Sequence, residues 1–158
     1  MGILANGTAN IPSDEYETPP DFYAHWNRVF NFQADLAASC YNTLVGGGHY
    51  FHKSNSALDN NWDFLRENLW LNPPYSQKAG PLKKWVSRCI HEAAKGASIV
   101  ALLPDDSSTE YYNHIAESVY VARRIPIYKR LRFYYQGKPA PYAAPMPSML
   151  VHFYTARP

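Results

Sequence analysis

The stretch Leu69-Trp70-Leu71-Asn72-Pro73-Pro74-Tyr75 restricts the fold of this chain more than any other. Its three apolar residues predict a short buried strand. The two prolines fix φ at their own positions and keep the residues before them extended, so the strand ends in a rigid turn. Asn72 therefore has little conformational freedom at the strand end, and Tyr75 lies just beyond the turn. We expect the rest of the chain to be organised around this turn.

The turn carries groups that suit an amino group on a flat ring. The carbonyl oxygens of Asn72 and Pro73 can accept both protons of the amine, and Tyr75 can stack on the ring. Binding both protons draws the nitrogen lone pair out of conjugation and directs it at an electrophile. An Asn-Pro pair alone more often only closes a strand, but the whole motif favours a catalytic turn made of Asn72, Pro73, Pro74 and Tyr75.

Length and composition indicate one globular domain. The chain has 158 residues, of which 46% are hydrophobic and 15% aromatic, enough to build a core. We expect residues 1–15, which are polar and lack periodicity, to form a flexible lead-in, and residues 16–158 to form the domain. No apolar run reaches about 18 residues and no charged-then-apolar leader opens the chain, which predicts neither a membrane span nor secretion.

Charge and cysteine content restrict the kind of ligand. The net charge is only +2, so a nucleic-acid site has to be a local basic patch. Cys40 and Cys89 lack metal-ligand spacing, and the six histidines form no metal-binding pair, so we predict no metal site. Cys89 lies in an apolar helical stripe and is expected to be a buried thiol, as in a reducing compartment.

Strands alternate with helices along the chain, which predicts an α/β fold with a mostly parallel sheet. Thr18 is expected to cap the first helix, and Ser107 with Glu110 matches a capping box before the third. The closing strands, around a Pro- and Ala-rich loop, predict an antiparallel pair at one edge of the sheet. The predicted strands are 32–35, 49–52, 69–71, 98–103, 119–122 and 148–154, and the predicted helices cover about 19–30, 82–94 and 107–118.

Several segments near the strand ends suit a ligand. Asp35 ends the first predicted strand, and the small residues after it let a ligand approach the backbone. Its carboxylate can pair with a cation or an ammonium group, or it can merely cap the next element. Thr18 lies at a helix N-terminus, which attracts a carboxylate, although a cap alone explains it equally well. Ser76 and Lys78 belong to a polar link that can order over a ligand.

The most basic stretch follows the fifth predicted strand. Cations alternate there with the aromatic residues Tyr128 and Phe133. A solvated strand face is the plain alternative, but cations and aromatics close to a base-binding turn favour contact with backbone phosphates. The five cations, which fall within ten residues, are Arg123, Arg124, Lys129, Arg130 and Arg132.

Asn72-Pro73-Pro74-Tyr75 resembles the motif with which amino-directed S-adenosylmethionine (SAM) methyltransferases bind the target amino group. The order of the segments from about residue 16 to 154 resembles the phage-type Dam-like DNA adenine methyltransferases. This resemblance implies a Rossmann-like SAM methyltransferase fold without a separate target-recognition domain. It also implies direct methyl transfer from SAM to the N6 amine of an adenine flipped out of double-stranded DNA, in the cytoplasm of a bacterium or of a phage-infected host.

The resemblance implies roles for individual residues as well. Thr18 and Pro19 match the segment that touches the SAM methionyl group, and Asp59 stands near an acid for the SAM adenine or ribose. Phe133 is the best match to the aromatic that sandwiches the flipped base against Tyr75. The implied cofactor residues are Thr18, Pro19, Asp35, Ala37, Asp59 and Asn72, and the implied substrate residues are Tyr75, Ser76, Lys78, Arg123, Arg124, Arg130, Arg132 and Phe133.

Two other functions are compatible with the sequence. Protein-glutamine methyltransferases that act on release factors use the same tetrapeptide, but they usually carry a fuller glycine-rich SAM motif and an N-terminal helical domain. In this chain Asp35-Leu36-Ala37-Ala38 stands where the glycine pattern is usual. The second alternative is a catalytically silent nucleic-acid-binding module, which would not need Asn72, Tyr75 and Asp35 together.

Overall fold

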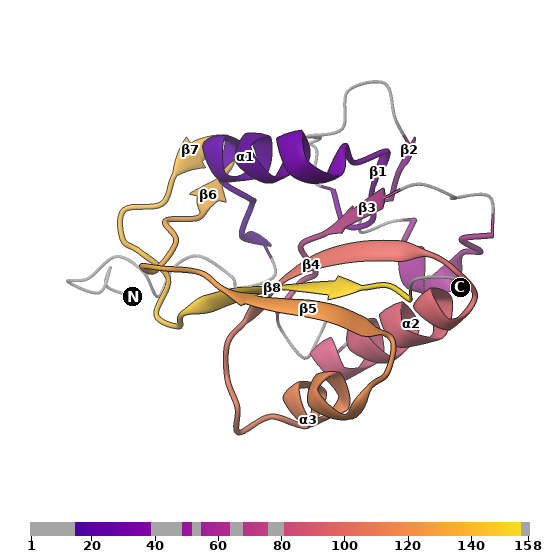
Figure 1. Cartoon of the computed structure of the whole chain (residues 1–158). Coiled ribbons are helices and arrows are strands. Elements are labelled where there is room, and N and C mark those ends of the chain that lie inside the picture. Colours follow the sequence, from indigo (N-terminus) through magenta and orange to yellow (C-terminus); the bar gives the residue numbers. More distant parts are fainter. Residues whose placement is uncertain (1–14, 39–48, 52–54, 64–67, 76–80, 156–158) are drawn as a thin grey trace.

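A six-stranded sheet forms the centre of the molecule, and its strands follow the order β2-β1-β3-β4-β8-β5 (Figure 1). The structure is a computed structural model and describes residues 15–38, 49–51, 55–63, 68–75 and 81–155. The strands of this sheet are β1 (Ala34–Asp35), β2 (His49–Tyr50), β3 (Asn68–Leu71), β4 (Ser98–Pro104), β5 (Val121–Pro126) and β8 (Ser148–Phe153).

The sheet is parallel on one side and antiparallel on the other. β1 pairs in parallel with β2 and β3, and β3 pairs in parallel with β4. β8 runs antiparallel to both β4 and β5. This arrangement confirms the predicted α/β fold with a mostly parallel sheet and a closing antiparallel pair. It also means that β1, β3, β4 and β5 all end at the same side of the sheet, which we call the carboxyl edge.

Helices cover both faces of the sheet and create two apolar cores. α1 (Pro20–Phe30) lies on one face, and α2 (Leu82–Ala94) and α3 (Glu110–Glu117) lie on the other (Figure 1). Side chains of β4 alternate between the faces because a strand has a period of two. The core under α2 and α3 therefore receives Ile99, Ala101 and Leu103, and the core under α1 receives Val100 and Leu102.

The start of α3 differs from the sequence prediction. Thr109 caps the helix, because its hydroxyl accepts a hydrogen bond from the Tyr112 N–H. The predicted cap at Ser107 is wrong. The Asp106 carboxylate accepts hydrogen bonds from the backbone N–H and the hydroxyl of Ser108, and this local turn delays the helix by two residues.

A two-stranded sheet lies apart from the main one and was not predicted. β6 (Tyr134–Tyr135) and β7 (Lys138–Pro139) form an antiparallel hairpin. Gln136 and Gly137 connect them with φ values of 50° and 78°. Two successive left-handed residues are what a two-residue type I′ turn requires. The hairpin occupies part of the region predicted as a loop.

Arg88 on α2 connects this helix to the short 3-10 helix η3 (Ala57–Asp59). Its guanidinium donates to three backbone carbonyls in and after η3, at 3.4, 3.1 and 2.6 Å, and to the Glu92 carboxylate at 2.9 Å. It also lies 4.5 Å from the centre of the Trp62 ring. Glu92 is only 4% exposed, and Arg88 is its nearer cationic partner, while Lys95 lies 3.4 Å from the carboxylate.

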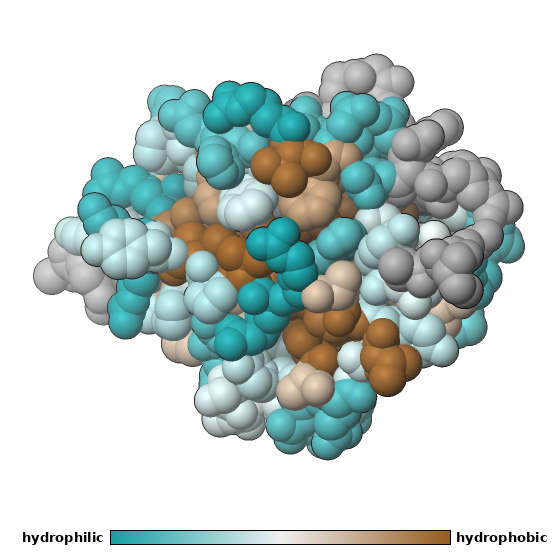
Figure 2. All heavy atoms as spheres, in the orientation of Figure 1, coloured by the Kyte–Doolittle hydropathy of each residue, from teal (hydrophilic) through white to brown (hydrophobic). Residues whose placement is uncertain are grey.

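Most residues of the edge strand β5 are exposed, and apolar and hydrophilic residues mix on the face shown in Figure 2. Val119, just before β5, is 81% exposed. Cys89 is fully buried in α2, as predicted. Within the described ranges, the helices are too short or too polar to cross a bilayer.

Candidate active site

Asn72 lies at the carboxyl edge directly after β3, and its side-chain amide is held in one orientation. Nδ2 donates to the Tyr16 carbonyl oxygen at 3.3 Å and to the Thr18 hydroxyl at 3.1 Å. A carbonyl oxygen only accepts, so the amide nitrogen has to face Tyr16 and the amide oxygen has to point away from it. The predicted acceptor atom of Asn72 therefore has a fixed direction.

Thr18 supports this orientation and does not cap the helix. The N-cap position of α1 belongs to Pro19, and no side chain caps the helix, so the prediction of Thr18 as N-cap is wrong. Its hydroxyl instead bonds to Asn72, 54 residues away in the sequence. Thr18 is 2% exposed, so bulk water does not compete for this bond.

The Tyr75 hydroxyl has two acceptors within reach. It lies 3.0 Å from Asn72 Oδ1 and 3.0 Å from the Leu102 carbonyl oxygen. A tyrosine hydroxyl has one proton, so it donates to one of them at a time. Burial raises the pKa of Tyr75 well above its ordinary value, so the hydroxyl keeps its proton. The site thus contains a donor that can turn from Asn72 to Leu102 when another donor arrives.

Phe133 lies beside Tyr75, but Tyr16 covers its face. The Tyr75 and Phe133 rings meet edge to face, with centroids 6.2 Å apart and an interplanar angle of 84°. Tyr16 stacks on Phe133 with centroids 5.0 Å apart and an angle of 8°, and Phe133 is 2% exposed. A base can stack on Phe133 only if Tyr16 moves. The accessible aromatic surface belongs to Tyr16 and Tyr75, which are both partly exposed.

Asp35 ends β1 at the carboxyl edge and pairs in register with Trp70, two residues before Asn72. Asp35 is 3% exposed, and its carboxylate accepts a hydrogen bond from the Ala37 N–H at 3.0 Å. Burial raises the pKa of Asp35 to about 7, and the bond from Ala37 opposes this shift only in part. Asp35 has no cationic partner among the described residues, so a positively charged ligand would stabilise its ionised form.

Tyr23 brings a second buried polar group within reach of the Asp35 charge. Tyr23 lies on α1 and is 5% exposed, and its hydroxyl lacks a hydrogen-bond partner in the described part of the chain. Burial and, less strongly, the Asp35 charge raise the pKa of Tyr23 to about 12. Tyr23 was not among the predicted site residues, because a tyrosine on the apolar face of a helix gives no local sign of a ligand. An unpaired buried hydroxyl beside a ligand-suited acid adds it to the candidate site.

Other predicted ligand residues stand outside this centre. Asp59 is exposed at the end of η3, and within the described ranges no hydrogen bond joins it to Asp35 or Asn72. Pro19 is half-buried at the start of α1. Ser76 and Lys78 lie outside the described residues.

The basic stretch divides into two groups, of which the first lies on β5. Arg123 and Arg124 are exposed there. Arg124 pairs with Asp105 at 3.4 Å, and its guanidinium lies 5.4 Å from the centre of the Tyr112 ring. These contacts hold Arg124 against the α3 side of the sheet.

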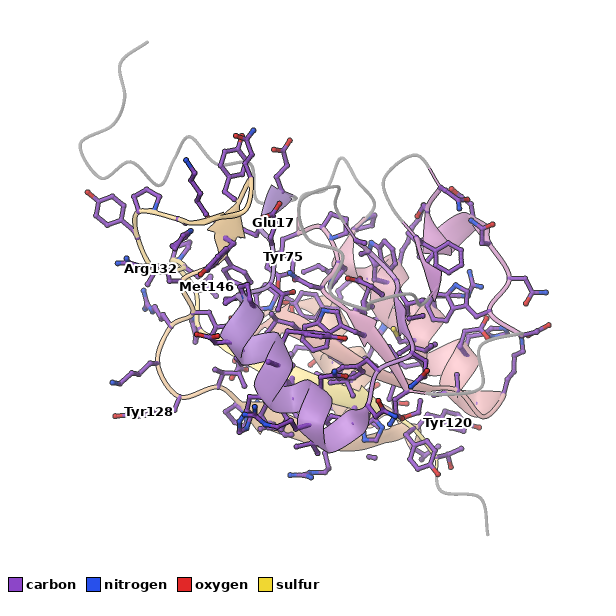
Figure 3. The ribbon with its side chains drawn as sticks, turned by 90° about the horizontal axis from the view of Figure 1, so that it is seen from above. Glu17, Tyr75, Tyr120, Tyr128, Arg132 and Met146 are labelled. Atoms are coloured by element: carbon purple, nitrogen blue, oxygen red, sulfur yellow. The ribbon has the colours of Figure 1, made fainter. Side chains whose placement is uncertain are left out.

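The second group follows β5 after the strand has reached the carboxyl edge. Lys129, Arg130 and Arg132 are all exposed. Arg132 directly precedes Phe133, whose ring contacts Tyr75. Figure 3 shows Arg132 on the same side of the molecule as Tyr75, near the start of α1. Arg132 is therefore the cation of this group that the fold brings nearest to the turn, through its neighbour Phe133.

The site combines an oriented amide oxygen, an adjacent aromatic surface and a buried carboxylate on the neighbouring strand. This combination can bind an aromatic amine beside a cationic ligand. A sequence model of the protein family described as DNA N-6-adenine-methyltransferase (Dam) matches residues 6–155, which include every element of the site. No curated protein matches the chain.

Proposed function

The chain belongs to the Dam family of DNA N6-adenine methyltransferases, and we propose that Asn72 binds and orients the adenine amine. The family match selects the DNA hypothesis over protein-glutamine methylation and over silent binding. The orientation of the Asn72 amide carries the proposal: its nitrogen is bound to Tyr16 and Thr18, so its oxygen is the atom offered to an incoming donor. The Pro73 carbonyl supplies the second acceptor. An acceptor that is already aligned contributes to rate because nothing has to reorganise during the reaction.

The Tyr75 hydroxyl lets Asn72 accept this amine without leaving a buried group unpaired. When the amine donates to Asn72 Oδ1, the Tyr75 proton can turn to the Leu102 carbonyl, which lies at the same distance of 3.0 Å. An unpaired buried hydroxyl would cost about 1–3 kcal/mol. Because the Leu102 carbonyl accepts the Tyr75 proton, binding of the base avoids most of this cost.

The family implies SAM as the methyl donor, and the groups around Asp35 fit this cofactor. When bound, SAM supplies an electrophilic methyl group on a sulfonium cation. We propose that the Asp35 carboxylate and the Tyr23 hydroxyl hold polar groups of SAM and that the turn at Ala37 lies along it. The raised pKa of Asp35 and the unpaired hydroxyl of Tyr23 support this assignment. Asp35 and Asn72 stand at the ends of neighbouring strands, so cofactor and amine would be held side by side.

The target adenine is proposed to leave a DNA duplex, which costs a few kcal/mol of unstacking. Stacking on an aromatic side chain returns roughly 1–3 kcal/mol per base. Tyr75 and Tyr16 offer the accessible aromatic surface, and Phe133 supports Tyr16 from behind. The exposed residues Arg130 and Arg132, which follow from the same edge of the sheet, are proposed to contact backbone phosphates.

The replacement Asn72→Ala tests the central assignment. Purified wild type and variant would be compared with tritiated SAM and an adenine-containing duplex. We expect methylation to fall by on the order of a hundred- to a thousandfold, while calorimetry shows SAM binding that is unchanged. Asn113→Ala, the same change on the exposed face of α3, is the matched control and should keep full activity. Near wild-type turnover in Asn72→Ala would refute the proposal.

A further inference from the structure

Two short segments far apart in the sequence, residues 16–18 and the β6–β7 hairpin, are joined by several contacts. The backbone of Glu17 pairs with that of Tyr134, with N···O distances of 2.8 and 2.9 Å. The Glu17 carboxylate accepts a hydrogen bond from the Gly137 N–H in the hairpin turn at 2.9 Å. Tyr16 stacks on Phe133, the residue before β6. Glu17 is 6% exposed, so its carboxylate is a buried group of this junction.

Two of the three residues 16–18 also hold the catalytic turn. The neighbours of Glu17 on both sides, Tyr16 and Thr18, are the two partners of Asn72 Nδ2. No hydrogen bond joins Glu17 itself to Asn72 in the described part of the chain. Figure 3 shows Glu17 and Tyr75 close together near the start of α1. Glu17 therefore acts on Asn72 indirectly, and its two neighbours make the direct contacts with the amide.

We propose that Glu17 is a positioning residue, which fixes the orientation of the Asn72 amide by fastening residues 16–18 to the hairpin turn. This inference rests on the proposed function of Asn72. A carboxylate that accepts from a backbone N–H forms a charge-assisted bond, roughly twice as strong as a neutral one. A hairpin of two-residue strands and a single backbone bridge are weak when isolated. The carboxylate bond to Gly137 therefore reinforces the two backbone bonds and the ring stack that hold the junction together.

Two conservative replacements separate the reach of this side chain from its charge. Glu17→Gln keeps the length and an acceptor oxygen but removes the charge. Glu17→Asp keeps the charge but is one methylene too short for the Gly137 N–H. The matched control is Glu117→Asp, the same change at the exposed end of α3. Steady-state methylation of a DNA duplex would give kcat and the KM values for SAM and DNA, and thermal unfolding would report folding.

We expect Glu17→Asp to lower kcat by at least about tenfold, since small misplacements near a reacting group have effects of this size. The KM values should stay within about twofold of wild type, because the lost interaction orients the amide and does not bind either substrate. Glu17→Gln should lose less of kcat than Glu17→Asp, because its amide oxygen can still accept from the Gly137 N–H in a weaker neutral bond, and Glu117→Asp should keep all of kcat. Wild-type kcat in Glu17→Asp, an equal loss in Glu17→Gln, or an effect confined to KM would each overturn the inference. An inactive wild type in the same assay would instead refute the proposed function.

Discussion

Replacing Thr18 with valine tests whether the Asn72 amide is oriented from within the protein. Valine keeps the shape of threonine but removes the hydroxyl, which leaves Nδ2 with the Tyr16 carbonyl at 3.3 Å as its partner. Thr18 is 2% exposed and Asn72 is 8% exposed, so water replaces the lost bond poorly. An unpaired buried N–H costs about 1–3 kcal/mol. Because about 1.4 kcal/mol corresponds to a factor of ten in rate, the penalty lowers kcat by roughly 5- to 150-fold if it falls on the productive orientation.

The assay separates this role from the cofactor contact that the sequence suggested for Thr18. Methylation of a duplex with tritiated SAM would be measured at varied SAM and varied DNA. We expect the loss in kcat with an unchanged KM for SAM. Thr109→Val is the matched control: it removes the cap of α3 and should lower the melting temperature while kcat stays the same. A raised KM for SAM with normal kcat in Thr18→Val would refute the orienting role.

The affinity for SAM should rise about tenfold between pH 6 and pH 8, because a cationic ligand binds the ionised form of Asp35, whose pKa is about 7. Calorimetry on Asp35→Asn should show no such rise, and a flat wild-type profile would remove Asp35 from the site. Arg88→Ala should lower the free energy of unfolding by about 3 kcal/mol, the lower end for a broken buried pair, since Glu92 loses its nearer partner and keeps the longer contact with Lys95 at 3.4 Å. A loss of less than about 1 kcal/mol, measured by urea titration, would contradict this prediction, because a loss of that size is typical of a solvent-exposed ion pair. Changing Arg130 and Arg132 together to glutamine should reduce the slope of log affinity for DNA against log salt by about two and leave SAM affinity unchanged. An unchanged slope would exclude both from the DNA interface.

The catalytic turn was predictable because its determinants are local. Pro73 and Pro74 restrict the backbone wherever the chain places them, and the apolar residues before Asn72 specify a buried strand. The continuous apolar run at 98–103 likewise indicated a strand buried on both faces, and β4 is that strand. Once these strands are parallel, Asp35 and Asn72 have to share an edge of the sheet, as they do.

The sequence failed where a distant partner competes with a local signal. Thr18 has a side chain that suits an N-cap, but its hydroxyl accepts a hydrogen bond from the amide of Asn72, which is 54 residues away in the sequence. Tyr16 stacks on Phe133 although more than a hundred residues separate them in the sequence, and sequence periodicity cannot predict such a contact. The hairpin turn at Gln136 and Gly137 did leave a signal, because a residue tolerant of left-handed φ followed by glycine suits a type I′ turn. Its strands were too short to be noticed.

The position of β8 has a consequence for how the protein is made. β8 lies between β4 and β5 and supplies the hydrogen-bond partners of both. During synthesis β4 and β5 leave the ribosome before β8, and the edge of each strand that will face β8 stays unpaired until residues 148–153 have followed. Until then, the exposed edge of the apolar strand β4 can pair with strands of neighbouring chains. A translation stop before Ser148 would remove a central strand of the sheet, and the shortened product would aggregate.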